Sequence, residues 1–412
     1  MNRQAIALAA DSAVTVGKKR VWKGMNKLFS LGPVNDIAIM VYNSADFIGY
    51  PWEIIIKSFR TKIGSKSFNS VSECADSFQK FLADERFHLD ESIVKSQLIF
   101  FVEILDSLKE RLPKTPKKIE KRNAIKEIIK SEMDTVDAID KITNSYDFND
   151  FCNEYKNSSI DPLIKDVFGA LPKSITLVIL RYLYEMWIRK FRSPYFTGII
   201  FAGYGKGEYF PCVVALAVDG KDKHILRCWR DDKGEMSISI GKDKSMVLAF
   251  GQGDITELFM EGTERSTKTF ISRLINRILD DKSERLINDY IADADERLVE
   301  LVRQKQDNRI ISDMMSKELT KFGRRKVAHP ILEVVRALPK EELAAMARAL
   351  VEVTALRRKM DSALESVGGP VDVAVISKGD GLIWIDRKHY FNLEKNRDYL
   401  DRKKSLRRDD DG

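Results

Sequence analysis

Residues 1–46, MNRQAIALAADSAVTVGKKRVWKGMNKLFSLGPVNDIAIMVYNSAD, form a series of short apolar runs separated by turn-forming residues. The runs QAIALAA, KLFSL and IAIMVYN are shorter than ordinary helices, and Asp11 closes the first of them. Closely spaced runs of this kind predict neighbouring antiparallel strands. The sequence therefore indicates a protein that enters a sheet by residue 5.

Helical and strand patterns alternate along the rest of the chain. Apolar residues have helical spacing in PWEIIIKSFR, in SVSECADSFQKFLADE and in most of residues 91–195 and 254–366. Strand-like runs return between residues 197 and 250 as TGIIFAG, CVVALAVDG, HILRCW, EMSISI and SMVLAF. The last two runs, VDVAVIS and LIWID, are joined by KGDG, which predicts a hairpin. Two packed antiparallel sheets with helix layers outside satisfy this order.

The balance of charge argues against a nucleic-acid-binding protein. The 412 residues carry 69 basic and 62 acidic side chains in a mixed pattern, so the net charge is only +7. The one strongly basic stretch is 108–132, LKERLPKTPKKIEKRNAIKEIIKSE. We interpret it as a solvated helical face, with an anion-binding patch as the alternative.

Cysteine and histidine usage predicts neither a metal site nor a disulfide framework, and no cofactor is expected. The four cysteines are scattered without a CxxC pair, and the four histidines are far apart. AIALAA is too short for the core of an export signal, and no apolar run reaches the length of a membrane span. A cytoplasmic protein without membrane contact is the expectation.

Four segments, in this order, resemble the proteasome β-subunit family and the peptidase subunit of its bacterial two-component relative. The first is IALAADSAVTVG followed by NKLFSL, in which Asp11 and Lys27 have the family's acid-to-lysine spacing (27 − 11 = 16). The others are IAIMVYNSAD, AFGQGDITELFMEG with its Gly-x-Gly turn before a helix, and SVGGPVDVAVISKGDG. Together they cover roughly residues 1–60, 197–262 and 340–386.

The resemblance implies the fold of the N-terminal-nucleophile hydrolases, an α+β fold built as a four-layer αββα sandwich. It implies a single proteasome-like domain over 1–412 with its core in 1–105, 196–264 and 336–390. Residues 106–195 and 265–335 exceed the family pattern and are expected to be helical insertions outside the sandwich. Residues 391–412 form a charged C-terminal tail.

The resemblance also implies a threonine protease or amidohydrolase that acts in proteolysis. In such enzymes an N-terminal threonine attacks the peptide carbonyl, and its own α-amine is the base. Lys27 matches the lysine that favours the deprotonated amine, and Asp11 matches the acid that positions this lysine. We expect the two side chains to lie on adjacent strands within salt-bridge distance. The oxyanion-binding loop falls at Tyr42–Ala45, centred on Asn43.

Several positions depart from the family pattern. Tyr42–Ala45 lacks the family's glycine, although a backbone donor does not require one. Gln252 replaces an assisting serine, and its amide donates a hydrogen bond but relays protons poorly. Ser366 is the nearest match to the family's Asp and Ser, one position out of register. Counting back 16 positions from Asp11 places the nucleophile six residues before Met1 (11 − 16 = −5). Either translation starts earlier or the chain is a degenerate subunit.

Three hypotheses remain at this point. The first is the peptidase, acting on a peptide or amide substrate as a homo-oligomer, with an unfoldase or another protein as a partner. The second is a catalytically silent proteasome-like scaffold or assembly subunit. The third is a binding module that recognises an anionic partner through the basic insertion. The apolar helix around Leu177–Trp187 needs cover, which also predicts a homo-oligomer.

Overall fold

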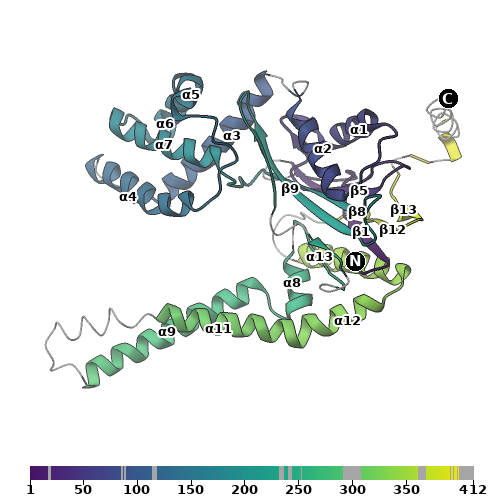
Figure 1. Ribbon diagram of the computed structural model, residues 1–412. Coiled ribbons are helices and arrows are strands. Elements are labelled where there is room, and N and C mark those ends of the chain that lie inside the picture. The colour runs from purple at the N-terminus through teal and green to yellow at the C-terminus, as the bar shows by residue number, and fades with distance from the viewer. Residues whose placement is uncertain are drawn as a thin grey trace. The chain divides into compact units, whose positions relative to one another are not determined.

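The computed structural model is a mixed α+β protein with antiparallel sheets (Figure 1). It describes residues 1–16, 20–84, 87, 90–113, 118–231, 236–239, 244–251, 253–290, 308–360, 368–389, 391–392, 394–396 and 398. The chain divides into two compact units. The first unit comprises Met1–Ala13, Ile238–Val375 and Trp384–Gly412, and the second comprises Val14–Ser237 and Ile376–Ile383.

The second unit is built on an antiparallel sheet with the order β10-β9-β8-β5-β4. Its strands are β4 (Leu28–Ser30), β5 (Asp36–Asn43), β8 (Thr197–Tyr204), β9 (Cys212–Lys221) and β10 (Leu226–Arg230), with β11 (Met236–Ser237) paired to β9. β5 and β8 run side by side from the pair Asp36–Tyr204 to the pair Asn43–Thr197. Two further strand pairs are β2 (Ala13–Val16) with β3 (Arg20–Lys23), and β6 (Asp46–Phe47) with β7 (Tyr50–Pro51).

Helices α1 (Trp52–Ile63) and α2 (Val71–Ala83) pack on this sheet. The side chain of Ser70 caps α2 by accepting a hydrogen bond from the backbone N–H of Glu73. Aromatic rings from both helices meet the sheet: Phe59 contacts Phe78 at 5.0 Å, and Phe78 contacts Phe201 of β8 at 5.4 Å between ring centroids. The result is a layer of helices over a sheet, held by a continuous apolar core.

The predicted insertion 106–195 is helical, as expected. Its helices are α3 (Asp90–Glu110), α4 (Lys118–Asp137), α5 (Phe148–Phe151), the π-helix η2 (Cys152–Ile160), α6 (Asp161–Phe168) and α7 (Lys173–Ile188). They form a second apolar core, in which α7 is largely buried. The prediction that α7 needs cover from another copy of the chain is therefore wrong, because α3, α4 and η2 already cover it.

A three-stranded sheet has the order β1-β12-β13, and all of β1 with parts of β12 and β13 belongs to the first unit. The strands are β1 (Ala5–Ala10), β12 (Asp372–Ser377) and β13 (Gly381–Asp386), and α13 (Lys340–Met360) packs on β1. The core includes Ala5, Leu343 and Val373. The other helices are α8 (Asp254–Glu261), α9 (Arg265–Tyr290), α11 (Asn308–Gly323), the π-helix η3 (Arg324–Ala328) and α12 (His329–Ala337), and η4 (Glu394–Asn396) is a 3-10 turn.

Two predicted strands are corrected by the structure. SMVLAF forms no strand: within it, Ser245 makes a single bridge to Asn2, and the N–H of Met246 donates to the carbonyl of Met1. An apolar run becomes a strand only where a ladder of backbone partners exists, and one bridge does not provide it. EMSISI contributes only β11 to the sheet, and Glu235 and Ile240 lie outside the described residues. The predicted hairpin of β12 and β13 is confirmed.

Candidate functional site

Asp11 lies immediately after β1 in the first unit, where its carboxylate organises the backbone. Oδ2 accepts hydrogen bonds from the N–H of Ala13 at 3.1 Å and from the N–H of Gly368 at 3.0 Å. Ser12 reinforces the same connection, because its N–H donates to the carbonyl of Gly368 and its hydroxyl donates to the carbonyl of Pro370. Asp11 therefore ties the end of β1 to the segment that leads into β12.

Lys27 and Asn43 lie close together along two paired strands of the second unit. Lys27 precedes β4, and its carbonyl accepts a hydrogen bond from the N–H of Val41 at 2.9 Å. β4 pairs with β5 in the register Leu28–Met40, so Lys27 is opposite Val41, which is two residues before Asn43. Because β1 and β4 belong to different sheets, the expectation that Asp11 and Lys27 occupy adjacent strands is wrong. A pairing between their side chains stays a prediction.

The loop at the end of β5 has an unusual backbone at Asn43. Its φ is 73°, in the left-handed region that asparagine tolerates better than most residues. The side-chain amide of Asn43 donates to the carbonyls of Pro194 and Phe196, at 3.0 and 2.7 Å. These bonds fix the loop Tyr42–Ala45 against the segment that leads into β8.

The loop Tyr42–Ala45 presents two backbone donors. Among the described residues, no hydrogen-bond acceptor is found for the N–H groups of Ser44 and Ala45, and both residues are only half-buried. Consecutive N–H groups that follow a left-handed residue are an arrangement suited to an anion. Two adjacent backbone donors are compatible with the oxyanion-binding role expected for this loop, and that role stays a prediction.

Further contacts hold this loop rigidly. The ring of Tyr42 lies across Gly198 of β8, so closely that a Cβ on Gly198 would come within 1.9 Å of it. Burial raises the pKa of Tyr42, which favours its neutral phenol. Nε1 of Trp52 donates to the hydroxyl of Thr197 at 3.0 Å, and the N–H of Trp52 donates to the carbonyl of Ala45. A donor pair on such a loop pays little reorganisation cost when a charge develops beside it.

Two predicted site residues, Gln252 and Ser366, lie outside the described residues. Their neighbours agree in part with the expected local structure. Gly253 is the N-cap of α8, so the predicted helix after the Gly-x-Gly turn is confirmed. Gly368, two residues after Ser366, is the residue that donates to Asp11. The link between the start of β12 and the end of β1 is thus present in the first unit.

A deeply buried ion pair among the described residues of the second unit is structural. Arg227 is fully buried and pairs with Asp219 at 3.1 Å. Its guanidinium also donates to the carbonyls of Met186, Trp187 and Arg189, at the C-terminal end of α7. Burial lowers the pKa of Arg227, and the attraction of Asp219 opposes this effect. The pair caps a helix and joins the insertion to β9 and β10.

Sequence reasoning missed Gly198, Trp52 and Thr197, which support the loop. The only signal for them was their place near the ends of predicted elements. Within the described part of the chain, no group of three or more His, Cys, Asp or Glu side chains is arranged to hold a metal ion. None of the described helices has the length and apolar character needed to cross a membrane.

Comparisons with known proteins give no assignment. No protein-family model matches the chain, and searches of curated proteins and of solved structures find no match. The resemblance to the proteasome β-subunit family therefore depends on the four sequence segments, and the case for function depends on the geometry of the loop Tyr42–Ala45.

Proposed function

We propose that the chain is a proteasome-like N-terminal-nucleophile hydrolase that cleaves peptide or amide bonds. The observation that carries the proposal is the anchored loop Tyr42–Ala45, with left-handed Asn43 followed by the N–H groups of Ser44 and Ala45. The sequence resemblance assigns the oxyanion-binding role to this same loop. Two lines of reasoning, one from motif and one from backbone geometry, thus favour the same residues.

The proposed architecture is a four-layer αββα sandwich. Each unit supplies a layer of helices on a sheet: α13 on β1 and β12 in the first unit, and α1 with α2 on the larger sheet in the second. The four-layer arrangement itself comes from the sequence resemblance, and a helix layer on a sheet in each unit is compatible with it. In this arrangement residues 106–195 and 265–335 are insertions outside the sandwich.

The proposed chemistry gives Lys27 and Asp11 the roles that the sequence resemblance implies. Lys27 keeps the α-amine of the nucleophile deprotonated, because a nearby cation disfavours a second positive charge. Asp11 holds the Lys27 ammonium. The proposed nucleophile is an N-terminal threonine, whose hydroxyl adds to the carbonyl carbon while its α-amine takes the proton. The N–H groups of Ser44 and Ala45 donate to the resulting oxyanion.

A peptide epoxyketone tests this proposal, because it forms a stable ring only with an N-terminal residue that offers both a hydroxyl and an α-amine. The protein is produced in an extended form, in which a segment that begins with a free N-terminal threonine is added before Met1. We expect intact-mass spectrometry to show one adduct on the extended protein. Lys27→Ala should abolish the adduct, whereas Lys80→Ala, an exposed lysine on α2, should leave it unchanged. An extended, folded protein that forms no adduct contradicts the proposal.

A second candidate function is a catalytically silent proteasome-like subunit. The observation that favours it is the structural role of Asp11, whose Oδ2 already accepts hydrogen bonds from two backbone N–H groups. A scaffold would retain Asp11 for this connection alone. In that case Asp11→Asn should lower stability in both the extended and the present form, and no extended form should react with the epoxyketone. Both candidates imply a homo-oligomer, and a clean 47.2 kDa monomer in sedimentation at micromolar concentration would argue against both.

A further inference from the structure

The two sides of helix α11 have different surroundings in the first unit. On one side the helix packs along α9 and against α8 (Figure 1). Gly323 is buried there, and a Cβ at this position would come within 2.5 Å of the carbonyl oxygen of Glu261. The opposite side, here called the outer face of α11 and η3, is exposed.

The outer face carries an apolar stripe. Four of its side chains are exposed by 44 to 63%: Ile311, Met314, Met315 and Phe322. At about 100° per residue, these four positions lie at about 0°, 300°, 40° and 20° around the helix, within one arc of about 100°. An arc of this width is what a helix normally packs against another element. Methionine is also adaptable in shape, which suits a binding surface.

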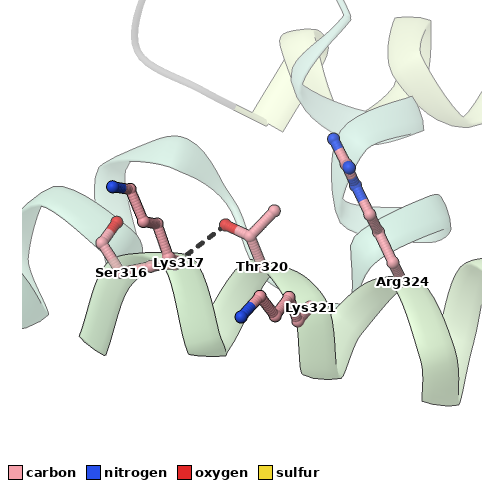
Figure 2. Close-up of a pocket in the computed structure, with 5 residues that line it drawn as sticks. All are labelled: Ser316, Lys317, Thr320, Lys321 and Arg324. Atoms are coloured by element: carbon pink, nitrogen blue, oxygen red, sulfur yellow. Dashed lines mark hydrogen bonds between the residues drawn. The ribbon is translucent and has the colours of Figure 1, made fainter. Parts of the chain in front are cut away.

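A row of cations borders this stripe. A hollow beside α11 has a volume of about 530 Å³. Figure 2 shows the described residues that line it: Ser316, Lys317, Thr320, Lys321 and Arg324. The hydroxyl of Thr320 donates to the carbonyl of Ser316 at 2.9 Å, which leaves the three cations as the strong donors. Arg325 and Lys326 follow directly and are exposed. The described lining holds three cations and no carboxylate, and one of these cations, Lys321, also pairs with Glu318 on the same helix.

We propose that the outer face of α11 and η3 is a docking surface for an acidic amphipathic helix of a partner protein. The apolar side of such a helix packs on the stripe of Ile311, Met314, Met315 and Phe322. Its carboxylates pair with Lys317, Lys321 and Arg324 along the border. This proposal does not depend on the hydrolase activity.

Charge decides against a second copy of the chain and against a lipid surface. A second copy would present the same excess of exposed cations, from Lys317 to Lys326, so the two faces would repel one another. A lipid surface would have to accommodate Glu318, which lies at about 340°, inside the apolar arc. Hydrogen bonding to Lys321 lowers the pKa of Glu318, so this carboxylate stays charged, and a charge is costly in the acyl region.

The test uses two fluorescein-labelled synthetic peptides of about 18 residues, or five helical turns. Both have leucines at helical spacing, and the remaining positions are mostly glutamate in one and mostly lysine in the other. Fluorescence anisotropy with the full chain should show that the glutamate peptide binds at least about tenfold more tightly, the factor that corresponds to 1.4 kcal/mol. Phe322→Ser with Met314→Ser should weaken this binding.

Charge reversal is the decisive arm of the test. Lys321→Glu with Arg325→Glu should invert the preference, so that the lysine peptide binds more tightly. Lys126→Glu with Lys130→Glu, the same change on exposed positions of α4, should leave the preference unchanged. Circular dichroism checks that all variants are folded. Equal binding of both peptides, or a preference that charge reversal does not alter, overturns the proposal. An α11-dependent dimer that excludes the peptide also overturns it, as does binding to phosphatidylglycerol vesicles that excludes the peptide.

Discussion

Substitution of Asn43 tests the geometry of the candidate oxyanion loop. Asn43→Ala removes two hydrogen bonds from Nδ2, to the carbonyls of Pro194 and Phe196. Because both bonds are exposed to water, each contributes about 0.5 kcal/mol, the low end of the range for proteins. The left-handed backbone at φ 73° costs alanine about 1 kcal/mol more. The local free energy of opening should therefore fall by about 2 kcal/mol, which corresponds to about thirtyfold faster exchange.

Hydrogen–deuterium exchange measured by mass spectrometry reports this opening in peptides that cover 36–47 and 192–204. Asn43→Gly loses the same two hydrogen bonds but accepts a positive φ without strain, so its loss should be about 1 kcal/mol. Asn123→Ala, at an exposed position of α4, is the matched control and should not change exchange in these peptides. Equal exchange in the alanine and glycine variants would refute the left-handed backbone. Wild-type exchange in both would refute the anchoring role of Asn43.

Three further predictions concern the second unit. Gly198→Ala should lower the melting temperature, because overpacking against Tyr42 costs about 1–3 kcal/mol. Tyr42→Ala should remove this added cost. Equal effects of Gly198→Ala in the wild type and in Tyr42→Ala would exclude the contact. Burial raises the pKa of Tyr204 from 10.0 to about 12, so its contribution to stability is full below pH 10 and is lost as the pH rises through 12. The melting temperature of Tyr204→Phe should therefore fall less steeply than that of the wild type as the pH rises between these two values. An unchanged slope would exclude Tyr204 as the cause of the pH dependence. Arg227→Met should cost about 3–5 kcal/mol in urea unfolding, because it leaves Asp219 buried without its partner. Adding Asp219→Asn should recover part of this loss, and no recovery would argue against the ion pair.

Local patterns predicted much of the fold. The strands of residues 5–10 and 36–43, the final hairpin and the helical character of residues 106–195 follow from apolar spacing and turn residues. The loop Tyr42–Ala45 was also located from the sequence, because it directly follows a predicted strand. Each of these features is determined by residues that are neighbours in the chain, which is the information that periodicity contains.

The remaining features depend on long-range pairing. The fit of Tyr42 over Gly198 requires the β5–β8 register, which joins residues separated by the whole helical insertion. The cap that Arg227 forms on α7 likewise depends on where β10 meets the insertion. SMVLAF has the composition of a strand, but composition does not show whether a partner strand is present. The cover of α7 was misjudged for the same reason, since part of it comes from α3, where Phe100 contacts Trp187, 87 residues later in the chain (187 − 100 = 87).

A crystal structure of the extended protein bound to a peptide epoxyketone tests the hydrolase proposal most directly. We expect Nζ of Lys27 to lie within about 4 Å of a carboxylate oxygen of Asp11 and near the α-amine of the modified threonine. The adduct oxygen should accept hydrogen bonds from the N–H groups of Ser44 and Ala45, at about 2.7–3.1 Å. A structure in which Lys27 points into solvent away from Asp11, with the loop Tyr42–Ala45 remote from the N-terminus, would contradict the hydrolase proposal and favour the scaffold.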